Sequence, residues 1–270
     1  MLADMHTHSE SSHDSVCKIE DMCNAQIKAG TAAFAVTDHF NTSEYGKIDI
    51  FTPIQKACDR AFELNEKFGD KLTVLRGIEL GDGFLDHKVY EKAISLCEYD
   101  VVIGSVHVWK NGDGVNVYST FDFSAISFEE SEKIVDGYFD DIITMVQTQS
   151  IDILAHLTYP LRYINGKYKV GIGLSKYEKK IEKILCIIIE KGIALEVNTS
   201  SVDTLGALMP PIDIIKKYYD MGGRLITLGS DAHAAENASK AFGETVEALK
   251  EIGFKNIYWY KSRKPIAIEI

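Results

Sequence analysis

The sequence lacks the two patterns that would direct a chain into or across a membrane. No apolar run approaches the roughly 18 residues that a membrane-spanning helix needs. The opening stretch, MLADMHTHSES, has no basic segment followed by an apolar one, so it does not match a secretory signal peptide. We therefore expect a cytoplasmic protein with no membrane partner.

Cysteine is present but lacks the spacing of a metal or disulfide motif. The five cysteines are an odd number, and no two of them form a CxxC pair. Most fall in helix-like stretches, where cysteine behaves as a small apolar residue. This usage predicts reduced thiols in a reducing compartment.

Positive charge is also scarce. The chain has 29 Lys and Arg against 40 Asp and Glu, which gives a net charge of −11. Such a chain lacks the basic surface of a nucleic-acid-binding protein, so we expect no nucleic-acid partner. An anionic small molecule remains a possible ligand only where positive charge is concentrated in its site.

Short apolar segments alternate with amphipathic ones along the whole chain. The strand candidates are Leu2–His6, Ala32–Thr37, Leu72–Glu79, Val101–His107, Ile151–His156, Ile193–Asn198 and Leu225–Asp231. The helix candidates lie near 18–29, 53–67, 88–97, 129–149, 175–191, 211–221 and 238–252. Nearly continuous apolar runs such as VVIGSV are typical of parallel strands buried on both faces. No linker interrupts the series, so residues 1–270 are predicted to form one domain.

A repeated strand–helix series predicts either a barrel or a doubly wound sheet. Nearly every strand candidate ends in a polar residue capable of chemistry. A barrel brings all these ends to one mouth, whereas a doubly wound sheet gathers its site at one switch point. We therefore predict an α/β fold of the TIM-like barrel type.

Histidines and carboxylates are concentrated at these strand ends. His6 and His8 are two positions apart on a strand, so their side chains point to the same side and can reach one metal ion. Glu79 closes the apolar run LTVLRGIEL, where an ionised carboxylate needs a partner or a metal. The other such residues are His39, His107, His156, Asp231 and His233. Imidazole and carboxylate groups ligate zinc, manganese and iron, so the set predicts a metal cluster.

The order of the motifs resembles the PHP (polymerase and histidinol phosphatase) family. The chain carries DxHxH, TDH, GxE, GSxH, AHxxYP, EVN and GSDAH in sequence, between Asp4 and His233. The stretch AHLTYPLRY is similar to the histidinol-phosphatase branch in particular. The resemblance implies a distorted barrel of seven βα units. It also implies three divalent metal ions, with zinc, manganese and iron all open.

The resemblance further implies how the ligands are shared. The first ion would be held by His6, His8, Glu79 and Asp231, and the second by Glu79, His107 and His156. The third would be held by His39, His233 and one residue of the Ser12–Ser15 stretch. Asp14 is favoured there, because the pattern His-x5-Asp-Ser is similar to members that use an aspartate, and His13 is the alternative.

The implied activity is hydrolysis of a small phosphate ester. Three divalent ions, about +6, against three acidic ligands, about −3, leave a pocket of about +3 in an acidic chain. A metal-bridging hydroxide, activated by the cluster that includes Glu79, Asp231 and His233, would attack the phosphorus of L-histidinol phosphate. Arg162 resembles the family's phosphate-binding arginine, and its alternative is an exposed loop cation. Competing interpretations are another phosphate ester or nucleotide, a nuclease, a C–N hydrolase and a non-catalytic metal-binding protein.

One departure from the branch concerns a second arginine, which its members often carry soon after the EVNTS segment. Here EVNTSSVDTLGALMPP contains no arginine after Asn198. Lys167 or Lys169 is the candidate replacement, and another phosphate ester is the alternative explanation. The oligomeric state stays open.

Five side chains and one segment complete the expectations. Asp4 and Asp38 either orient the neighbouring histidines from behind or are simply solvated. His87 is expected to be a loop or helix-cap residue, with a contact to a ligand residue or to substrate as the alternative. The connection 108–128 is long for a loop and is a candidate cover for the mouth, with Trp109 and Tyr118 either contacting substrate or packing locally.

Overall fold

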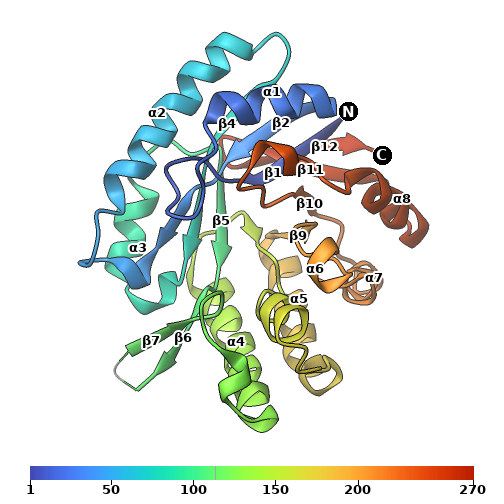
Figure 1. Cartoon of the computed structure of the whole chain (residues 1–270). Helices are drawn as coiled ribbons and strands as arrows, with labels where there is room; N and C mark the ends of the chain where they lie inside the picture. The colour runs from blue at the N-terminus through green and yellow to red at the C-terminus, as the bar shows by residue number, and fades with distance from the viewer. Residues whose placement is uncertain (113) are drawn as a thin grey trace.

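Parallel strands form the centre of the molecule (Figure 1). The computed structural model describes residues 1–112 and 114–270. The central strands pair in the order β1-β2-β4-β5-β8-β9-β10. They are β1 (Leu2–Thr7), β2 (Thr31–Val36), β4 (Thr73–Gly81), β5 (Val101–Ser105), β8 (Ile153–Leu154), β9 (Ala194–Asn198) and β10 (Ile226–Gly229). A short strand, β3 (His39–Asn41), also pairs with β4. All seven strand candidates of the sequence are therefore confirmed.

The first and last of these strands meet, so the sheet nearly closes. The amide of His8 donates to the carbonyl of Ala232 at 2.9 Å, and the amide of Asp231 donates to the carbonyl of His6 at 2.8 Å. Thr7 and Ala232 form an isolated parallel bridge. The predicted single-domain barrel is confirmed, and its carboxyl ends converge as expected.

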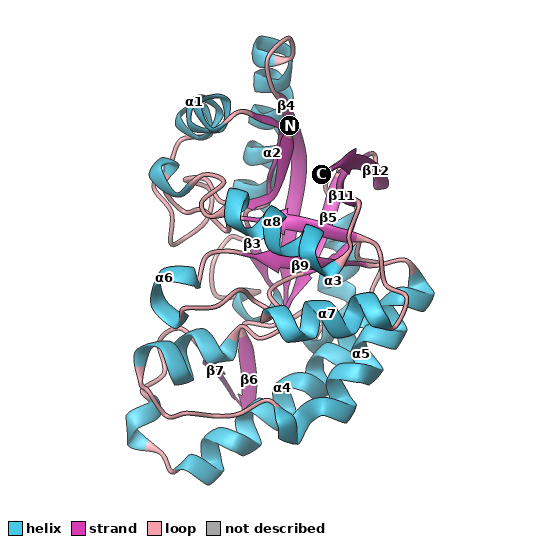
Figure 2. Ribbon diagram, turned by 90° about the vertical axis from the view of Figure 1, so that its right-hand side faces the viewer, coloured by secondary structure: helices cyan, strands magenta, loops and turns pink. Residues whose placement is uncertain are grey.

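Helices surround the barrel (Figure 2). They are α1 (Ile19–Ala29), α2 (Phe51–Phe68), α3 (His87–Ile94), α4 (Phe128–Thr148), α5 (Glu178–Lys191), α6 (Val202–Leu205), α7 (Ile212–Asp220) and α8 (Phe242–Ile252). Helix α4 begins with a capping box in which Ser127 and Glu130 exchange hydrogen bonds. His87 is the exposed first residue of α3, as the loop-or-cap interpretation requires. None of the helices in the described part of the chain has the length and apolarity to span a membrane.

The barrel interior is filled by small and branched side chains below the mouth. This cluster contains Ala3, Met5, Ala33, Ala35, Leu75, Val101, Ile103, Ile153, Ala155 and Ala194, with Tyr260 alongside. Tyr260 belongs to a C-terminal hairpin of β11 (Asn256–Lys261) and β12 (Lys264–Glu269). Close packing of this kind gives the strand ends above it a rigid base.

Strand β1 has an irregularity that matters for the site. Ala3 and Met5 pack in the barrel interior, whereas Asp4 accepts a hydrogen bond from Gln26 of α1 at 2.7 Å. Strict alternation would therefore send His6 outward with Asp4. The pairing of β1 with β2 shifts register between Asp4 and Thr7, and His6 turns to the inside of the barrel.

Asp141 on α4 provides a stability prediction. Burial, followed by the nearby Asp82 carboxylate, raises the pKa of Asp141 to about 6. A raised carboxyl pKa means that the folded state prefers the proton, so the stability falls as the pH rises from about 4 to about 6 and the full cost remains at higher pH. We expect Asp141→Asn to raise the free energy of unfolding at pH 8 by about 1–2 kcal/mol after allowance for solvent screening. Denaturant unfolding as a function of pH measures this gain.

The pH dependence identifies the cause of this gain. The gain in the free energy of unfolding should shrink steadily as the pH falls toward about 4, where the carboxyl of Asp141 becomes protonated in both the folded and the unfolded state. Asp140→Asn is the matched control, because Asp140 is the adjacent carboxylate but is 61% exposed and paired with Lys180 at 2.8 Å. An equal gain at all pH values, or the same gain for Asp140→Asn, would show that burial of the charge is not responsible.

Candidate metal centre

Glu79, at the carboxyl end of β4, is the fully buried centre of the site. Its two carboxylate oxygens face different histidines. Oε1 lies 3.2 Å from His107 Nε2 and 3.0 Å from His156 Nε2. Oε2 lies 3.5 Å from His6 Nε2 and 3.7 Å from His8 Nε2. One carboxylate therefore faces two separate pairs of imidazoles, as a bridging ligand does.

Asp231 faces the first of these pairs from the other side. Its Oδ1 lies 3.1 Å from His8 Nε2 and 3.7 Å from His6 Nε2. Two imidazole nitrogens and two carboxylate oxygens thus surround one space. This is the group expected for the first metal ion.

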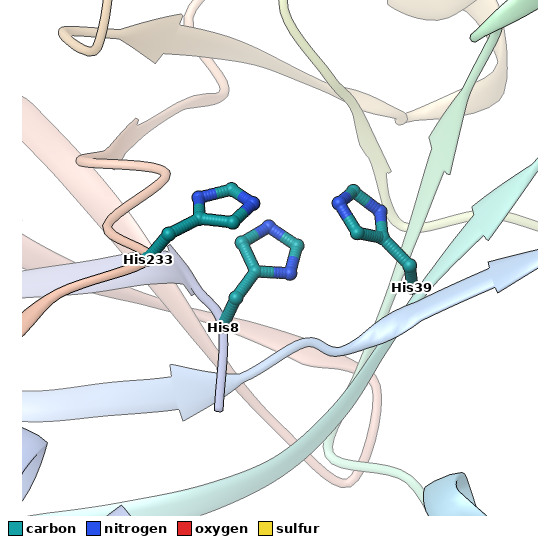
Figure 3. Close-up of side chains that lie close together, drawn as sticks. All are labelled: His8, His39 and His233. Atoms are coloured by element: carbon teal, nitrogen blue, oxygen red, sulfur yellow. The ribbon is translucent and has the colours of Figure 1, made fainter. Parts of the chain in front are cut away.

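A third group lies nearer to solvent. Oδ2 of Asp14 is 3.4 Å from His39 Nε2 and 3.2 Å from His233 Nε2. The ring of His8 stacks against both His39 and His233, with centroid distances of 4.2 and 4.1 Å (Figure 3). His13 is half exposed, and its Nε2 is 4.0 Å from Oδ2 of Asp14, farther than the nitrogens of His39 and His233. The geometry favours Asp14 over His13 as the additional ligand.

Several buried atoms in this cluster have no hydrogen-bonding partner. They are Nε2 of His6, Nε2 of His8, Nδ1 of His39 and Oε2 of Glu79. His39 Nδ1 is only 2.6 Å from Glu79 Oε2, yet the two are not aligned for a hydrogen bond. A buried polar atom without a partner costs about 1–3 kcal/mol, and several that converge on one place require a common partner. These donor atoms fit divalent cations with mixed nitrogen and oxygen ligands.

The cluster also keeps its carboxylates ionised, as metal ligands must be. Burial alone would raise the pKa of Glu79, but the facing imidazoles of His107, His39 and His6 outweigh it and hold that pKa well below its usual range. The same balance of burial against neighbouring histidines holds the pKa of Asp231 well below its usual range. The ionised carboxylates therefore stabilise a positive charge at this position, from imidazolium or from a metal.

Hydrogen bonds on the far side of the imidazoles fix which nitrogen faces the cluster. His6 Nδ1 lies 2.6 Å from Glu196 Oε1, and His107 Nδ1 lies 3.0 Å from Asn41 Oδ1. His233 Nδ1 lies 2.9 Å from the carbonyl oxygen of Asp231. In each case an oxygen faces Nδ1, so a neutral ring with its proton on Nδ1 would donate to that oxygen and leave Nε2 free for a metal ion.

Asp38 acts on His8 through a serine. Ser12 Oγ donates to Asp38 Oδ1 at 2.7 Å and lies 3.2 Å from His8 Nδ1. Asp4 is also fully buried, but its oxygens accept from the amide and hydroxyl of Ser230, which ties β1 to the end of β10. The solvated interpretation of both aspartates is therefore wrong, and only Asp38 reaches an imidazole.

A cavity of about 340 Å³ opens above the cluster. Asp14, His39, His107, His156, Asp231 and His233 line its inner part. Arg162 also lines it, and its Nη1 donates to Ser200 Oγ at 3.0 Å and lies 3.5 Å from Asp231 Oδ2. Arg162 is therefore a cavity residue, and the exposed-loop alternative is wrong.

Two expectations about the surroundings of this cavity are corrected. Lys167 lies over the ring of Tyr168 at 4.9 Å, and neither it nor Lys169 is among the lining residues. The lysine that does line the cavity is Lys240. Sequence reasoning missed it because no motif surrounds it.

The segment after His107 does not cover the mouth. It forms a hairpin of β6 (Val108–Asn111) and β7 (Gly114–Val117), which extends beside α4 (Figure 1). Trp109 packs locally against Tyr118 and Phe121, with ring centroids 4.7 and 4.9 Å apart. No residue of 108–112 or 114–128 lines the cavity. The hairpin instead buries its aromatic residues against its own loop.

Sequence comparison identifies the family of this chain. A model of the PHP domain matches residues 4–200. The chain belongs to the PHP domain family. A probable histidinol-phosphatase of Thermotoga maritima is 28% identical over 94% of both chains. Another from Clostridium acetobutylicum is 27% identical over 97% of this chain and 98% of its own.

A solved structure of a histidinol phosphate phosphatase has the same fold. Histidinol phosphate phosphatase from Lactococcus lactis, complexed with zinc, L-histidinol and phosphate, superposes with a TM-score of 0.78. The two chains are 22% identical, and 98% of each is covered. The likeness supports the barrel architecture for this PHP-family chain.

Glu196 is the PHP-site residue whose role the sequence did not reveal. It is fully buried, and besides facing His6 it accepts from the amide of His156 at 2.7 Å. We expect Glu196→Gln to lower metal affinity or activity by about 10–100-fold, because it removes the negative charge that orients His6. Metal retained against a competing chelator, measured by mass spectrometry, checks this.

The matched control is Glu182→Gln on α5. Glu182 pairs with Lys217 at 2.7 Å far from the cluster and loses the same charge. Equal metal retention by Glu196→Gln and Glu182→Gln would show that His6 needs no carboxylate behind it.

Proposed function

We propose that this PHP-family protein is a metal-dependent phosphomonoesterase that hydrolyses L-histidinol phosphate to L-histidinol and phosphate. The observation that carries the proposal is one cavity in which a histidine–carboxylate cluster lies beside the guanidinium of Arg162. The two curated relatives are named as probable histidinol-phosphatases, and a structure of the same fold holds L-histidinol and phosphate. Histidinol phosphate belongs to histidine biosynthesis, so the proposal places the protein in the cytoplasm.

The proposed cofactors are three divalent ions, with zinc, manganese and iron as candidates. The first would be held by His6, His8, Glu79 and Asp231, the second by Glu79, His107 and His156, and the third by Asp14, His39 and His233. When bound, such ions neutralise phosphoryl oxygens and lower the pKa of coordinated water so that hydroxide is available near neutral pH.

The protein's own residues orient the substrate. Arg162 has a planar guanidinium that can grip two phosphoryl oxygens at once. Its Nη1 is held by Ser200 and by Asp231, which fixes it beside the cluster before substrate arrives. Fixed donors of this kind stabilise the charge that develops on the phosphoryl oxygens without having to reorganise.

A second candidate is a different small phosphate ester. The stretch after Asn198 carries the acidic Asp203 rather than an arginine, and Asp203 lines the cavity. This change affects the part of the site that selects the substrate and leaves the metal ligands intact. A nucleic-acid substrate is not part of the proposal, in line with the net charge of −11.

Phosphate release by protein reconstituted with manganese, zinc or iron tests the proposal. L-histidinol phosphate is compared with p-nitrophenyl phosphate, other monoesters and nucleotides. A kcat/KM for L-histidinol phosphate far above the others supports the full assignment. A higher kcat/KM on another ester would keep the assignment as a phosphoesterase but replace the proposed substrate. If no phosphate is released from any ester with any metal, the proposal is overturned.

A further inference from the structure

A pair of opposite charges lies at the outer part of the same cavity. Lys240 Nζ donates to Asp203 Oδ2, and both residues line the cavity with Thr204 and Asn237. Asp203 belongs to α6, and Lys240 lies just before α8, 37 positions later in the chain. Their side chains are 64% and 44% exposed, against 6% for Asp231. The pair therefore lies at the rim, outside the metal ligands.

Lys240 is the second cationic side chain in the cavity, besides Arg162. Among the described lining residues, Arg162 and Lys240 are the two that carry a lysine or arginine side chain. Arg162 is held at the inner end by Ser200 and Asp231. An exposed ion pair such as Asp203–Lys240 contributes only about 0–1 kcal/mol. A charged substrate can therefore exchange partners with it at little cost.

We propose that the Asp203–Lys240 pair recognises a phosphate ester that carries an ammonium group close to the phosphate. Lys240 binds phosphoryl oxygens, and Asp203 binds the ammonium. This inference rests on the proposed function and names the feature that selects the substrate. It also explains how the site works without an arginine after Asn198.

The spacing of charges in such a substrate matches the pair. In L-histidinol phosphate the amine is on the carbon next to the CH₂–O–P group, so ammonium and phosphate are separated by a few bonds. Asp203 and Lys240 are in direct contact, so their charged ends are separated by a similarly short span. Binding replaces one ion pair within the protein by two ion pairs with the substrate, and no charge is left without a partner.

Asp203 has a second effect on selectivity. A phosphate ester without an ammonium brings only negative charge toward this carboxylate, which repels it. Repulsion of the wrong ligand is as effective a source of specificity as attraction of the right one. The pair therefore favours aminated esters over amine-free ones.

Steady-state kinetics on two substrates test the proposal. The substrates are L-histidinol phosphate and the amine-free p-nitrophenyl phosphate. Asp203→Asn should raise KM for L-histidinol phosphate by about 10-fold and leave KM for p-nitrophenyl phosphate unchanged or lower. Lys240→Gln should raise KM for both by about 10-fold, and Lys240→Arg should retain most of the affinity. Metal content and kcat should change little in all three variants.

The matched control is Lys250→Gln. Lys250 lies on α8, is 42% exposed and pairs with Glu247 at 2.9 Å, so this variant loses the same charge outside the cavity. Kinetics of Lys240→Gln equal to those of Lys250→Gln overturn the inference, as does an equal effect of Asp203→Asn on both substrates. In either case, the proposed function still holds if the wild-type protein hydrolyses L-histidinol phosphate. A wild type that releases phosphate from no ester removes the proposed function and this inference together.

Discussion

Glu79→Gln is expected to lower kcat/KM on the order of 10³-fold and to reduce the bound metal by at least one ion. The reason is the position of this carboxylate, with one oxygen at 3.0–3.2 Å from two imidazoles and the other facing His6 and His8. A neutral amide keeps the shape but removes the negative charge that would help to hold the proposed divalent ions. Metal content and phosphate release, measured on the same preparation, check this expectation.

The control for Glu79→Gln is Glu91→Gln on α3. Glu91 is 61% exposed, and its carboxylate lies 3.5 Å from His87 on the outside of the barrel. It should keep the metal content and the rate of the wild type. A Glu79→Gln protein that retains both would mean that the buried cluster is structural and that catalysis occurs elsewhere.

Arg162→Ala is expected to raise KM and to lower kcat/KM by about 10²-fold while the metal content stays unchanged. Arg162 is a neighbour of Asp231 but is not one of the histidines or carboxylates that are grouped as candidate metal ligands. Loss of its guanidinium removes fixed hydrogen bonds to the phosphoryl group, which are worth about 2–3 kcal/mol when charged. Steady-state kinetics with parallel metal analysis separate the two effects.

Two further variants make the arginine experiment specific. Arg162→Lys keeps the charge but not the planar pair of donors, so it should recover only part of the loss. Arg60→Ala removes an arginine that pairs with Glu20 and Glu63 on the surface and should leave the kinetics unchanged. Unchanged kinetics in Arg162→Ala would remove Arg162 from the phosphate site.

The elements, and the convergence of the histidines and carboxylates at the strand ends, were predictable because they follow from local patterns, whereas Asp14 came from the resemblance to the PHP family. The seven strands of the barrel were predicted from the periodicity of apolar residues and from the apolar runs. The polar residue that ends each run predicted their common mouth. Once a barrel is assumed, strand ends such as Glu79 and His107 must converge, whatever their distance in sequence. The structure brings together nine residues predicted as ligands, which are His6, His8, Asp14, His39, Glu79, His107, His156, Asp231 and His233.

The contacts behind those ligands depend on the tertiary structure. Glu196 is 190 positions from His6, and Asn41 is 66 positions from His107, so no local pattern pairs them. The register shift in β1 is a further example, since strict alternation would have pointed His6 away from the site. The pairing of strands in the closed barrel decides these partners: β1 is joined to β10 next to β9, which carries Glu196, and β3 and β5 both pair with β4.

At the outer part of the cavity, too, some features could be predicted from the sequence and others depend on the tertiary structure. The sequence by itself determined the fold class, the set of histidines and carboxylates expected to hold metal and the absence of an arginine after Asn198. It suggested Lys167 or Lys169 as the replacement and the segment 108–128 as a cover, because both are close in sequence to recognisable motifs. The tertiary structure put Lys240 opposite Asp203 instead and folded the segment into a hairpin. Loops are positioned by the elements on which they pack, and a linear pattern of residues does not contain that information.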